Sequence, residues 1–308
     1  MQKVPYQYGH NAIYYTHKVL KRNILELSQK YKFLEISSIG KSIKNRKIYI
    51  LKYGKGPRKI FVCGGTHACE WITVPILMKW VEEICHLYMC KETAYSKRIE
   101  ELFERSTIHV LPMLNPDGIE LQIKGITAHY PGYEKLIQWN NGSDDFSKWK
   151  ANIRGVDLNR NFNAQWEASK KIGKEEGIEG PWLEQYGGEY AESEPETAAI
   201  ANYTRQEDFD MVLSYHTQGQ EIYWCYDNFE IDGAKRLGTQ LAKASGYALG
   251  VPDRNAAYAG YKDWFIKEFK RPGYTIECGL GENPLPMTQF DQIYTENFEL
   301  LLIAAWGE

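Results

Sequence analysis

The apolar positions of the chain form short continuous runs, and longer segments with helical periodicity lie between them. Runs typical of strands occupy residues 34–39, 47–52, 59–63, 107–113, 211–214 and 274–278. Segments typical of helices occupy residues 11–30, 73–88, 194–204, 233–245 and 289–306. Residues 40–46 separate the first two strands as a hairpin turn. Beyond that hairpin, strands alternate with helices, which predicts a largely parallel sheet covered by helices on both faces.

One long segment departs from this pattern. Residues 115–188 have little periodicity and many Gly, Asn and Trp residues. Loops of this length are usually functional or disordered, and the aromatic content favours an ordered loop that builds a site. Directly after it, Ser193 and Glu196 have the spacing of a capping box, which predicts that Ser193 caps the next helix. No repeat or linker divides the chain, so we expect a single domain over residues 1–308.

Composition narrows the class of partner. The net charge is −3 and no basic block is present, which argues against nucleic acid or a membrane surface as the main partner. The six cysteines are scattered through the chain and are expected to be free thiols. The first ten residues lack the apolar stretch of a secretory signal, and no apolar run is long enough to span a bilayer. We therefore expect a cytoplasmic protein, with secretion by another route left open.

Two of the seven histidines stand where a ligand site is expected. His67 and His216 each follow a predicted strand in polar, Gly-rich surroundings. In parallel α/β sheets, ligands bind at these carboxyl ends of the strands. Glu70 follows His67 at the spacing His-x-x-Glu, which lets one imidazole and one carboxylate share an ion. With a distant His as third ligand, the set matches a catalytic zinc site with an open position.

Two further segments carry polar side chains suited to the same site. Residues 156–162 bring Asp157, Asn159 and Arg160 together, and Glu277 ends the last apolar strand. A guanidinium binds a carboxylate in bidentate fashion, and a nearby Asp can orient a zinc-bound His. A buried acid at a strand end favours a role as general base. A surface turn with an ordinary ion pair remains the alternative for residues 156–162.

The ordered set of these motifs resembles the zinc carboxypeptidase family typified by pancreatic carboxypeptidase A. It comprises His67-Ala68-Cys69-Glu70, Asn115-Pro116-Asp117-Gly118, Asp157-Leu158-Asn159-Arg160-Asn161-Phe162, His216 and Glu277. The resemblance runs from about Gly40 to the C-terminus. It implies a single-domain α/β fold whose mixed, mostly parallel eight-stranded sheet lies between helices. It also implies one Zn²⁺ per chain.

The resemblance assigns a role to each matching residue. His67, Glu70 and His216 would bind the zinc, and Glu277 would be the general acid/base that activates water. Asn159 and Arg160 would anchor the terminal carboxylate of the substrate, and Asp157 would orient a zinc-bound His.

Three positions are matched less directly. The family has an Arg that polarises the scissile carbonyl. Arg154 is the only Arg between Asn115 and Gly155 and is our prediction, with Lys148 and Lys150 close by. The family's mobile Tyr aligns with Asn255, so Tyr258 or Tyr261 is expected to replace it, with Tyr258 slightly favoured. Lys262 falls at the position that sets side-chain preference, where a lysine favours a substrate side chain with a carboxylate. An exposed loop lysine is the alternative.

The wording around the motifs is most similar to bacterial γ-D-glutamyl-L-diamino acid peptidases. Residues 149–162 and 216–224 carry this likeness. It implies hydrolysis of the γ-D-glutamyl–meso-diaminopimelate bond in murein peptides. The alternatives are release of C-terminal amino acids, deacylation or deglutamylation on the same fold, and a peptide-binding protein without activity. The sequence leaves the oligomeric state open.

Overall fold

The central feature of the molecule is one eight-stranded sheet. The computed structural model describes residues 14–90, 94–229, 231–252 and 257–307, and the sheet lies within them in the order β1-β2-β4-β3-β5-β8-β6-β7. The strands are β1 Glu35–Lys41, β2 Lys47–Gly54, β3 Arg58–Cys63, β4 Ser106–Leu111, β5 Met211–His216, β6 Glu221–Tyr223, β7 Ala248–Gly250 and β8 Gly273–Glu277. The middle strands β4, β3, β5 and β8 run parallel, whereas β1, β2 and β6 pair antiparallel with their neighbours. The sheet is therefore mixed and mostly parallel, as predicted.

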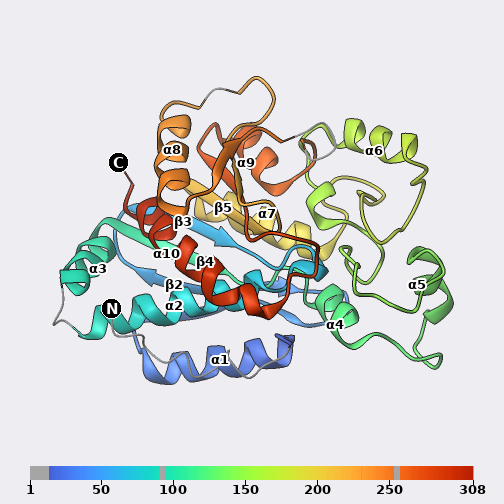
Figure 1. The fold of residues 1–308 in the computed structure, drawn as a ribbon, viewed down its shortest axis with the longest axis horizontal. Helices are drawn as coiled ribbons and strands as arrows, with labels where there is room; N and C mark the ends of the chain where they lie inside the picture. The colour runs from blue at the N-terminus through green and yellow to red at the C-terminus, as the bar shows by residue number, and fades with distance from the viewer. Residues whose placement is uncertain (1–13, 91–93, 230, 253–256, 308) are drawn as a thin grey trace.

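Helices cover both faces of the sheet (Figure 1). They are α1 His17–Lys30, α2 Thr73–Cys90, α3 Ala94–Arg105, α4 Pro116–Lys124, α5 Tyr133–Trp139, α6 Trp166–Glu175, α7 Pro195–Glu207, α8 Ala234–Ser245, α9 Tyr261–Phe269 and α10 Phe290–Trp306. Three short 3₁₀ helices are η1 Ala68–Glu70, η2 Leu158–Arg160 and η3 Met287–Gln289. Helices α2 and α10 lie against one face, and α7 and α9 against the other.

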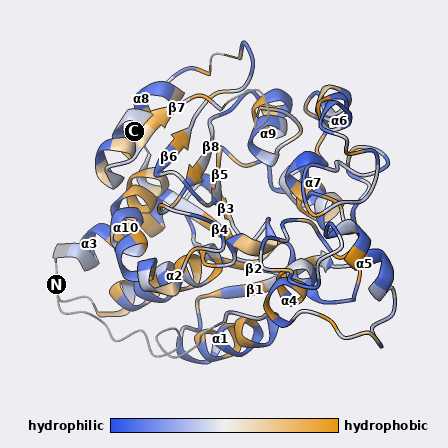
Figure 2. Ribbon diagram, turned by 45° about the vertical axis from the view of Figure 1, so that its right-hand side comes forward, coloured by the Kyte–Doolittle hydropathy of each residue, from blue (hydrophilic) through white to orange (hydrophobic). Residues whose placement is uncertain are grey.

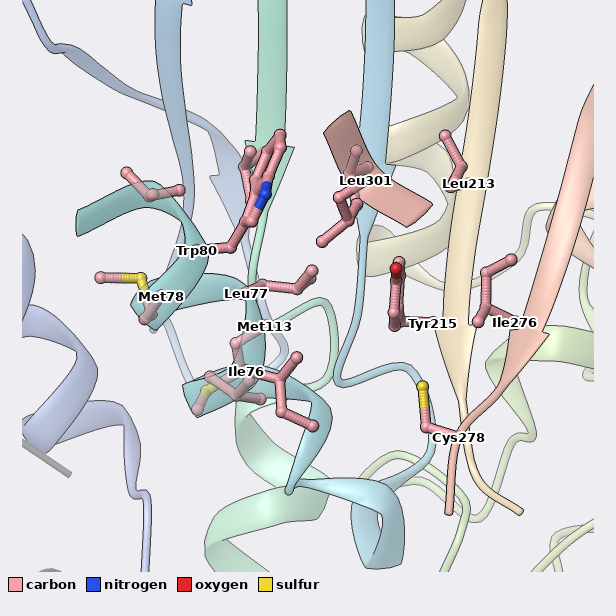
Figure 3. Close-up of a cluster of buried hydrophobic side chains, with 14 of the residues drawn as sticks. Ile76, Leu77, Met78, Trp80, Met113, Leu213, Tyr215, Ile276, Cys278 and Leu301 are labelled. Carbon is pink, nitrogen blue, oxygen red and sulfur yellow. The ribbon is translucent and has the colours of Figure 1, made fainter. Parts of the chain in front are cut away.

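The two faces of the sheet bury two separate hydrophobic clusters. Along β3, Ile60 and Val62 belong to one cluster, and Phe61 and Cys63 to the other. This alternation follows from the two-residue period of a strand. Figure 3 shows part of the larger cluster, where Trp80 and Leu77 of α2 lie close to Leu301 of α10. In Figure 2 the apolar residues concentrate on the strands and on α10. The fully buried central strands thus form a rigid frame for the ends that carry the site.

Most predicted elements are confirmed. All six predicted strands and the hairpin between β1 and β2 are present. The first helix begins at His17, after the Thr16 cap, and residues 11–13 of its predicted span lie outside the described residues. Strands β6 and β7 were missed because each has only three residues. All six cysteines are free thiols, as expected. Among the described helices, none combines the length and apolar character that a bilayer crossing requires.

The prediction for residues 115–188 needs correction. This segment contains α4, α5 and α6, whereas we expected a continuous loop. Helix α4 follows from the Asn115-Pro116-Asp117-Gly118 motif, in which the Asn115 side chain accepts a hydrogen bond from Gly118 N at 2.9 Å. Pro116 occupies the first turn, where its missing N–H costs no hydrogen bond. The motif is thus a helix start, which explains its strong sequence signature.

The predicted capping box before α7 is also wrong. The cap position is Glu194 and the helix begins at Pro195, so Ser193 lies one residue outside it. The Ser193 hydroxyl donates to Glu194 Oε1 at 3.0 Å. Glu196 is fully buried and accepts one hydrogen bond, from Ile43 N at 3.3 Å. Both glutamates are structural, but neither makes the reciprocal capping contacts.

The buried Glu196 predicts a pH dependence of stability. Burial raises the pKa of its carboxyl from 4.5 to about 7. The folded state therefore prefers the protonated acid, and this stabilisation is complete below the unfolded pKa and is lost as the pH rises through 7. The difference corresponds to about 3 kcal/mol. We expect Glu196→Gln to raise the free energy of unfolding at pH 8.5 by about 2–3 kcal/mol, and to change it little at pH 4.5.

Urea unfolding at the two pH values measures this effect. The exposed Glu179 gives the matched control, Glu179→Gln, which should shift stability equally little at both pH values. A Glu196→Gln protein whose gain is the same at pH 4.5 and 8.5 would contradict the raised pKa.

Candidate active site

The carboxyl end of β3 turns sharply because of two glycines. Gly65 has φ +60°, and an added Cβ there would lie 2.9 Å from Val74 Cγ2 and 3.1 Å from Met113 Cα. Only glycine combines this left-handed backbone with so close an approach to neighbouring chain. The turn presents His67 at the edge of the sheet, and its backbone is fixed by Asn115 N, which donates to Gly65 O at 2.9 Å.

The short helix η1 brings Glu70 back beside His67. Glu70 Oε1 lies 2.9 Å from His67 Nδ1. The Thr73 hydroxyl donates to Glu70 O at 2.9 Å and accepts from Gly65 N at 3.0 Å, so it ties the turn to the start of α2. The His-x-x-Glu spacing therefore places both side chains on one side of a rigid turn.

His216 is the last residue of β5, the strand next to β3. The chain passes from β3 to β4 on one side and later returns as β5 on the other, which makes this the switch point where ligands bind in such sheets. His216 Nδ1 lies 2.9 Å from Glu70 Oε2 and 3.2 Å from His67 Nδ1. Ser214, two residues earlier and on the same face, contacts His216 Nε2 at 3.1 Å. That contact fixes which ring nitrogen faces the other two residues.

The three side chains fit a zinc ion. The donor atoms of His67, Glu70 and His216 lie within 4.8 Å of one another, and all three residues are buried. A tetrahedral ion with bonds of about 2.0–2.1 Å keeps neighbouring donors about 3.3 Å apart. The observed separations of 2.9–3.2 Å are close to that value. Two imidazole nitrogens and one carboxylate leave a fourth position for water or substrate, as in catalytic zinc sites.

Asp157 lies behind His67, as the sequence predicts. Its Oδ1 is 3.2 Å from His67 Nε2 and accepts a hydrogen bond from Asn159 N at 3.0 Å. Its Oδ2 accepts from Gln185 N at 3.0 Å. A carboxylate in this place fixes the ring orientation of a metal-binding His and raises its basicity.

Glu277 ends β8 and faces the same site. Its Cα pairs with that of His216 across β5 and β8, so the two side chains share one edge of the sheet. Burial, with the charge of Glu70 added to it, raises the pKa of the Glu277 carboxyl to about 8. Burial disfavours the charged form of His67, but Glu70 and Asp157 outweigh it and raise the pKa of His67 to about 10. The concentration of carboxylates at this point calls for a positive charge, which a divalent cation supplies.

The two candidate cations for polarising a carbonyl lie in different surroundings. Arg154 is half exposed, and its Nε donates at 2.9 Å to Oε2 of Glu194, whose side chain is 3% exposed. Lys150 lies nearer the metal ligands: Ala68 N donates to Lys150 O at 3.0 Å. Burial disfavours its ammonium, but Glu184 and Glu70 outweigh this and raise the pKa of Lys150. The role predicted for Arg154 stays a prediction, and its guanidinium is engaged by Glu194.

The two tyrosines proposed to cover the substrate also separate. Tyr261 is 1% exposed, and its hydroxyl lies 2.8 Å from Thr204 Oγ1 inside a hydrophobic cluster. This removes Tyr261 from any surface that a substrate reaches. Tyr258 is partly exposed beside the same cluster and stays the proposed residue. Asn255 lies outside the described residues.

Arg160 and Asn159 are held next to the metal ligands. Arg160 Nε donates to Gln185 Oε1 at 2.8 Å, and Asn159 Oδ1 accepts from Tyr261 N at 3.0 Å. Lys262 is 4% exposed, so it is no exposed loop lysine. Its Nζ lies 2.5 Å from Cys225 O and 2.5 Å from Asp263 Oδ1. The charge of Arg160 also acts on Asp263, so both cations belong to one cluster.

Other residues of the site were not singled out from the sequence. Asn283 Nδ2 donates to Thr217 O at 2.9 Å and lies 3.5 Å from Glu70 Oε1. No local pattern marks it, because it reaches the site only through tertiary folding. Ser214 could have been found, since a residue two positions before His216 on a strand shares its face.

Comparisons with known proteins agree with this geometry. The model of the zinc carboxypeptidase family matches residues 21–300. The γ-D-glutamyl-L-diamino acid endopeptidase 1 of Lysinibacillus sphaericus is 38% identical over 289 residues, which cover 94% of this chain and 71% of that protein. The uncharacterized protein YqgT of Bacillus subtilis is 33% identical over 290 residues, which cover 93% of this chain and 76% of that one.

A solved structure shares the fold. It is bovine thrombin-activatable fibrinolysis inhibitor in complex with tick carboxypeptidase inhibitor, with a TM-score of 0.73 and 22% identity over 95% of this chain and 96% of that one. Since the family model spans most of the chain, the protein belongs to the zinc carboxypeptidase family and is a hydrolase of the metallopeptidase type.

Proposed function

We propose that this enzyme binds one zinc ion per chain and hydrolyses the γ-D-glutamyl–meso-diaminopimelate bond of murein peptides. The observation that carries the substrate assignment is the buried Lys262, which shares a charged cluster with Arg160. Together the two cations suit a residue that carries two carboxylates, which is the chemistry of diaminopimelate. The relative from Lysinibacillus sphaericus, named for the same bond type, supports the proposal.

The residues of the chain divide the work of hydrolysis. His67, Glu70 and His216 would hold the zinc, which polarises a carbonyl and lowers the pKa of water when bound. Glu277 takes a proton from the attacking water on a carboxylate oxygen and passes it to the leaving amine. Asp157 keeps the His67 ring in place throughout.

The test is product analysis. Purified, zinc-loaded protein is incubated with a defined murein tripeptide or tetrapeptide, and the products are identified by mass spectrometry. We expect cleavage between D-glutamate and diaminopimelate. Release of only a C-terminal amino acid would favour a general carboxypeptidase. Cleavage confined to acyl-amino acids or polyglutamate tails would favour a deacylase or deglutamylase.

Lys262 provides a prediction on specificity. Lys262→Met removes the ammonium and keeps most of the stem, so a diaminopimelate substrate loses one charge-assisted contact, worth about 1.5–3 kcal/mol. We expect kcat/KM for the diaminopimelate peptide to fall roughly 10- to 100-fold. The matched lysine peptide, which lacks the second carboxylate, should change little. Arg160→Ala should harm both peptides, because both carry the α-carboxylate.

The matched control is Lys267→Met on the same helix, since Lys267 Nζ contacts only Asn163 O, at 3.0 Å, in the hydrogen bonds that the structure records. Thermal melting of each variant shows whether Asp263 tolerates the loss of its partner. Equal slowing of both peptides by Lys262→Met would contradict a role in recognising the second carboxylate.

A further inference from the structure

Lys150 is fixed beside the metal ligands but is not one of them. Its carbonyl accepts a hydrogen bond from Ala68 N at 3.0 Å, directly after His67 in the chain. Its own N–H donates to Leu183 O at 3.0 Å, and the preceding Trp149 is fully buried. The main chain at Lys150 is therefore clamped between the metal-binding turn and a second segment.

The ammonium of Lys150 faces the centre of the site. It lies 2.6 Å from Glu184 Oε2, and about a third of its side chain is exposed. Its charge also acts on Glu70 and Asp157, and on Glu277. A cation that meets the acids on every side of the metal position, and that still contacts solvent, stands where a bound substrate enters.

Arg154 lies elsewhere. Its guanidinium makes a 2.8 Å ion pair with the buried Glu194, and Asn152 Nδ2 donates to the same carboxylate oxygen at 2.7 Å. The pair borders a cavity of about 280 Å³ lined by Trp139, Pro181 and Tyr190 among others. The carboxylate of Glu194 would be left buried without its counter-charge if Arg154 turned away, which ties Arg154 to that cavity.

We propose that Lys150, held in place by Glu184, is the catalytic residue that stabilises the negative charge on the carbonyl oxygen during hydrolysis. This assignment rests on the proposed hydrolytic function of the site. An ammonium carries three N–H donors, and the ion pair with Glu184 uses one of them.

The step balances without any change at Lys150. The oxygen of water forms a bond to the carbonyl carbon, and the π electron pair moves onto the carbonyl oxygen. That charge is lost again when the carbon–nitrogen bond breaks and the leaving amine takes a proton. Lys150 donates a hydrogen bond to this oxygen and keeps its own proton. A fixed donor of this kind contributes most where charge develops, in the transition state.

Glu184 is a positioning residue in this proposal. The segment 183–186 contacts the site through each of its residues: Leu183 O accepts from Lys150 N and Tyr186 O from Asp157 N, at 3.0 and 2.8 Å. Between them, Glu184 pairs with Lys150 and Gln185 N donates to Asp157. One short stretch of chain thus sets both the cation and the carboxylate behind His67.

The experiment compares Lys150→Met, Lys150→Arg and Glu184→Gln in zinc-loaded protein. Steady-state kinetics use whichever peptide of the product panel the wild type cleaves. We expect Lys150→Met to lower kcat by roughly 10²–10³-fold with little change in KM, as for other oxyanion donors. Lys150→Arg, which keeps the charge, should recover at least about tenfold of that loss, and Glu184→Gln should lower kcat less than Lys150→Met.

A second readout does not depend on turnover. A phosphinic pseudopeptide carries a tetrahedral anion in place of the scissile carbonyl, and calorimetry measures its affinity. We expect Lys150→Met to weaken it by about the same factor as kcat. The matched control is Lys148→Met, since Lys148 is mostly exposed and pairs with the exposed Glu282 at 3.3 Å. It should leave both readouts unchanged.

The outcomes separate this assignment from the proposed substrate. A wild type that cleaves other peptides but no murein peptide ends the substrate proposal, and the Lys150 comparison then runs on the peptide it does cleave. Lys150→Met with wild-type kcat and phosphinate affinity overturns the assignment. So does a loss of kcat in Arg154→Met that exceeds the loss in Lys150→Met while zinc content and melting temperature are normal in both.

Discussion

His216→Ala is expected to abolish both zinc binding and peptidase activity. His216 supplies one of three donors, and the two that remain leave a site with half of the tetrahedral shell. Loss of a residue that only orients a ligand costs about 10–100-fold in metal affinity, so loss of a ligand should cost more than ~10²-fold. Zinc content after dialysis and the zinc-dependent rise in melting temperature measure the effect.

Two further variants grade this result. Asp157→Asn keeps the contact to His67 but removes the charge, and should weaken zinc binding by about 10–100-fold. His129→Ala, at an exposed histidine away from the site, should leave zinc content and activity as in wild type. Wild-type enzyme that stays fully active after exhaustive chelation would rule out metal-dependent hydrolysis.

The metal ligands could be predicted because the fold brings strand ends together. His67 and His216 each follow a fully apolar strand, and the carboxyl ends of neighbouring parallel strands meet at one edge of the sheet. Glu277 follows by the same rule from β8, which pairs with β5 in parallel. The local pattern at each strand therefore sufficed to predict a site assembled from residues more than 200 positions apart in sequence.

The cations of the site were harder to predict, because their positions depend on contacts between distant loops. Arg154 pairs with Glu194, forty residues away, and Lys150 pairs with Glu184. Nothing in the sequence near Lys150 distinguishes it from the exposed Lys148 two residues earlier. The difference comes from Trp149, whose burial turns the two lysines to opposite surroundings.

The place of Tyr261 had a signal that was not used. Tyr261, Trp264 and Phe265 have the spacing i, i+3, i+4, which is the apolar face of a helix. In the structure all three are buried in one cluster. A tyrosine on such a face is more often a core residue than a mobile one, and Tyr258, which precedes the helix, does not share that pattern.

Glu277→Gln is expected to keep the fold and the zinc and to lose most of the turnover. A neutral amide has nearly the same shape as the carboxyl, but it cannot accept the proton of water. General acid–base catalysis contributes about 10²–10⁴-fold, and Glu277 would act on both the attacking water and the leaving amine. We therefore expect kcat to fall by at least ~10³-fold, measured with the same peptide and zinc content as for wild type.

A neighbouring carboxylate provides the control for this loss. Glu221 of β6 pairs with Glu277 in the sheet register, and its charge acts on the Glu277 carboxyl. Glu221→Gln removes a negative charge at almost the same place but leaves the proton acceptor intact, so most of the turnover should remain. If Glu221→Gln and Glu277→Gln lost activity equally, the effect would be electrostatic. If zinc-replete Glu277→Gln kept near-normal kcat, the proton transfer would have to be assigned to another group.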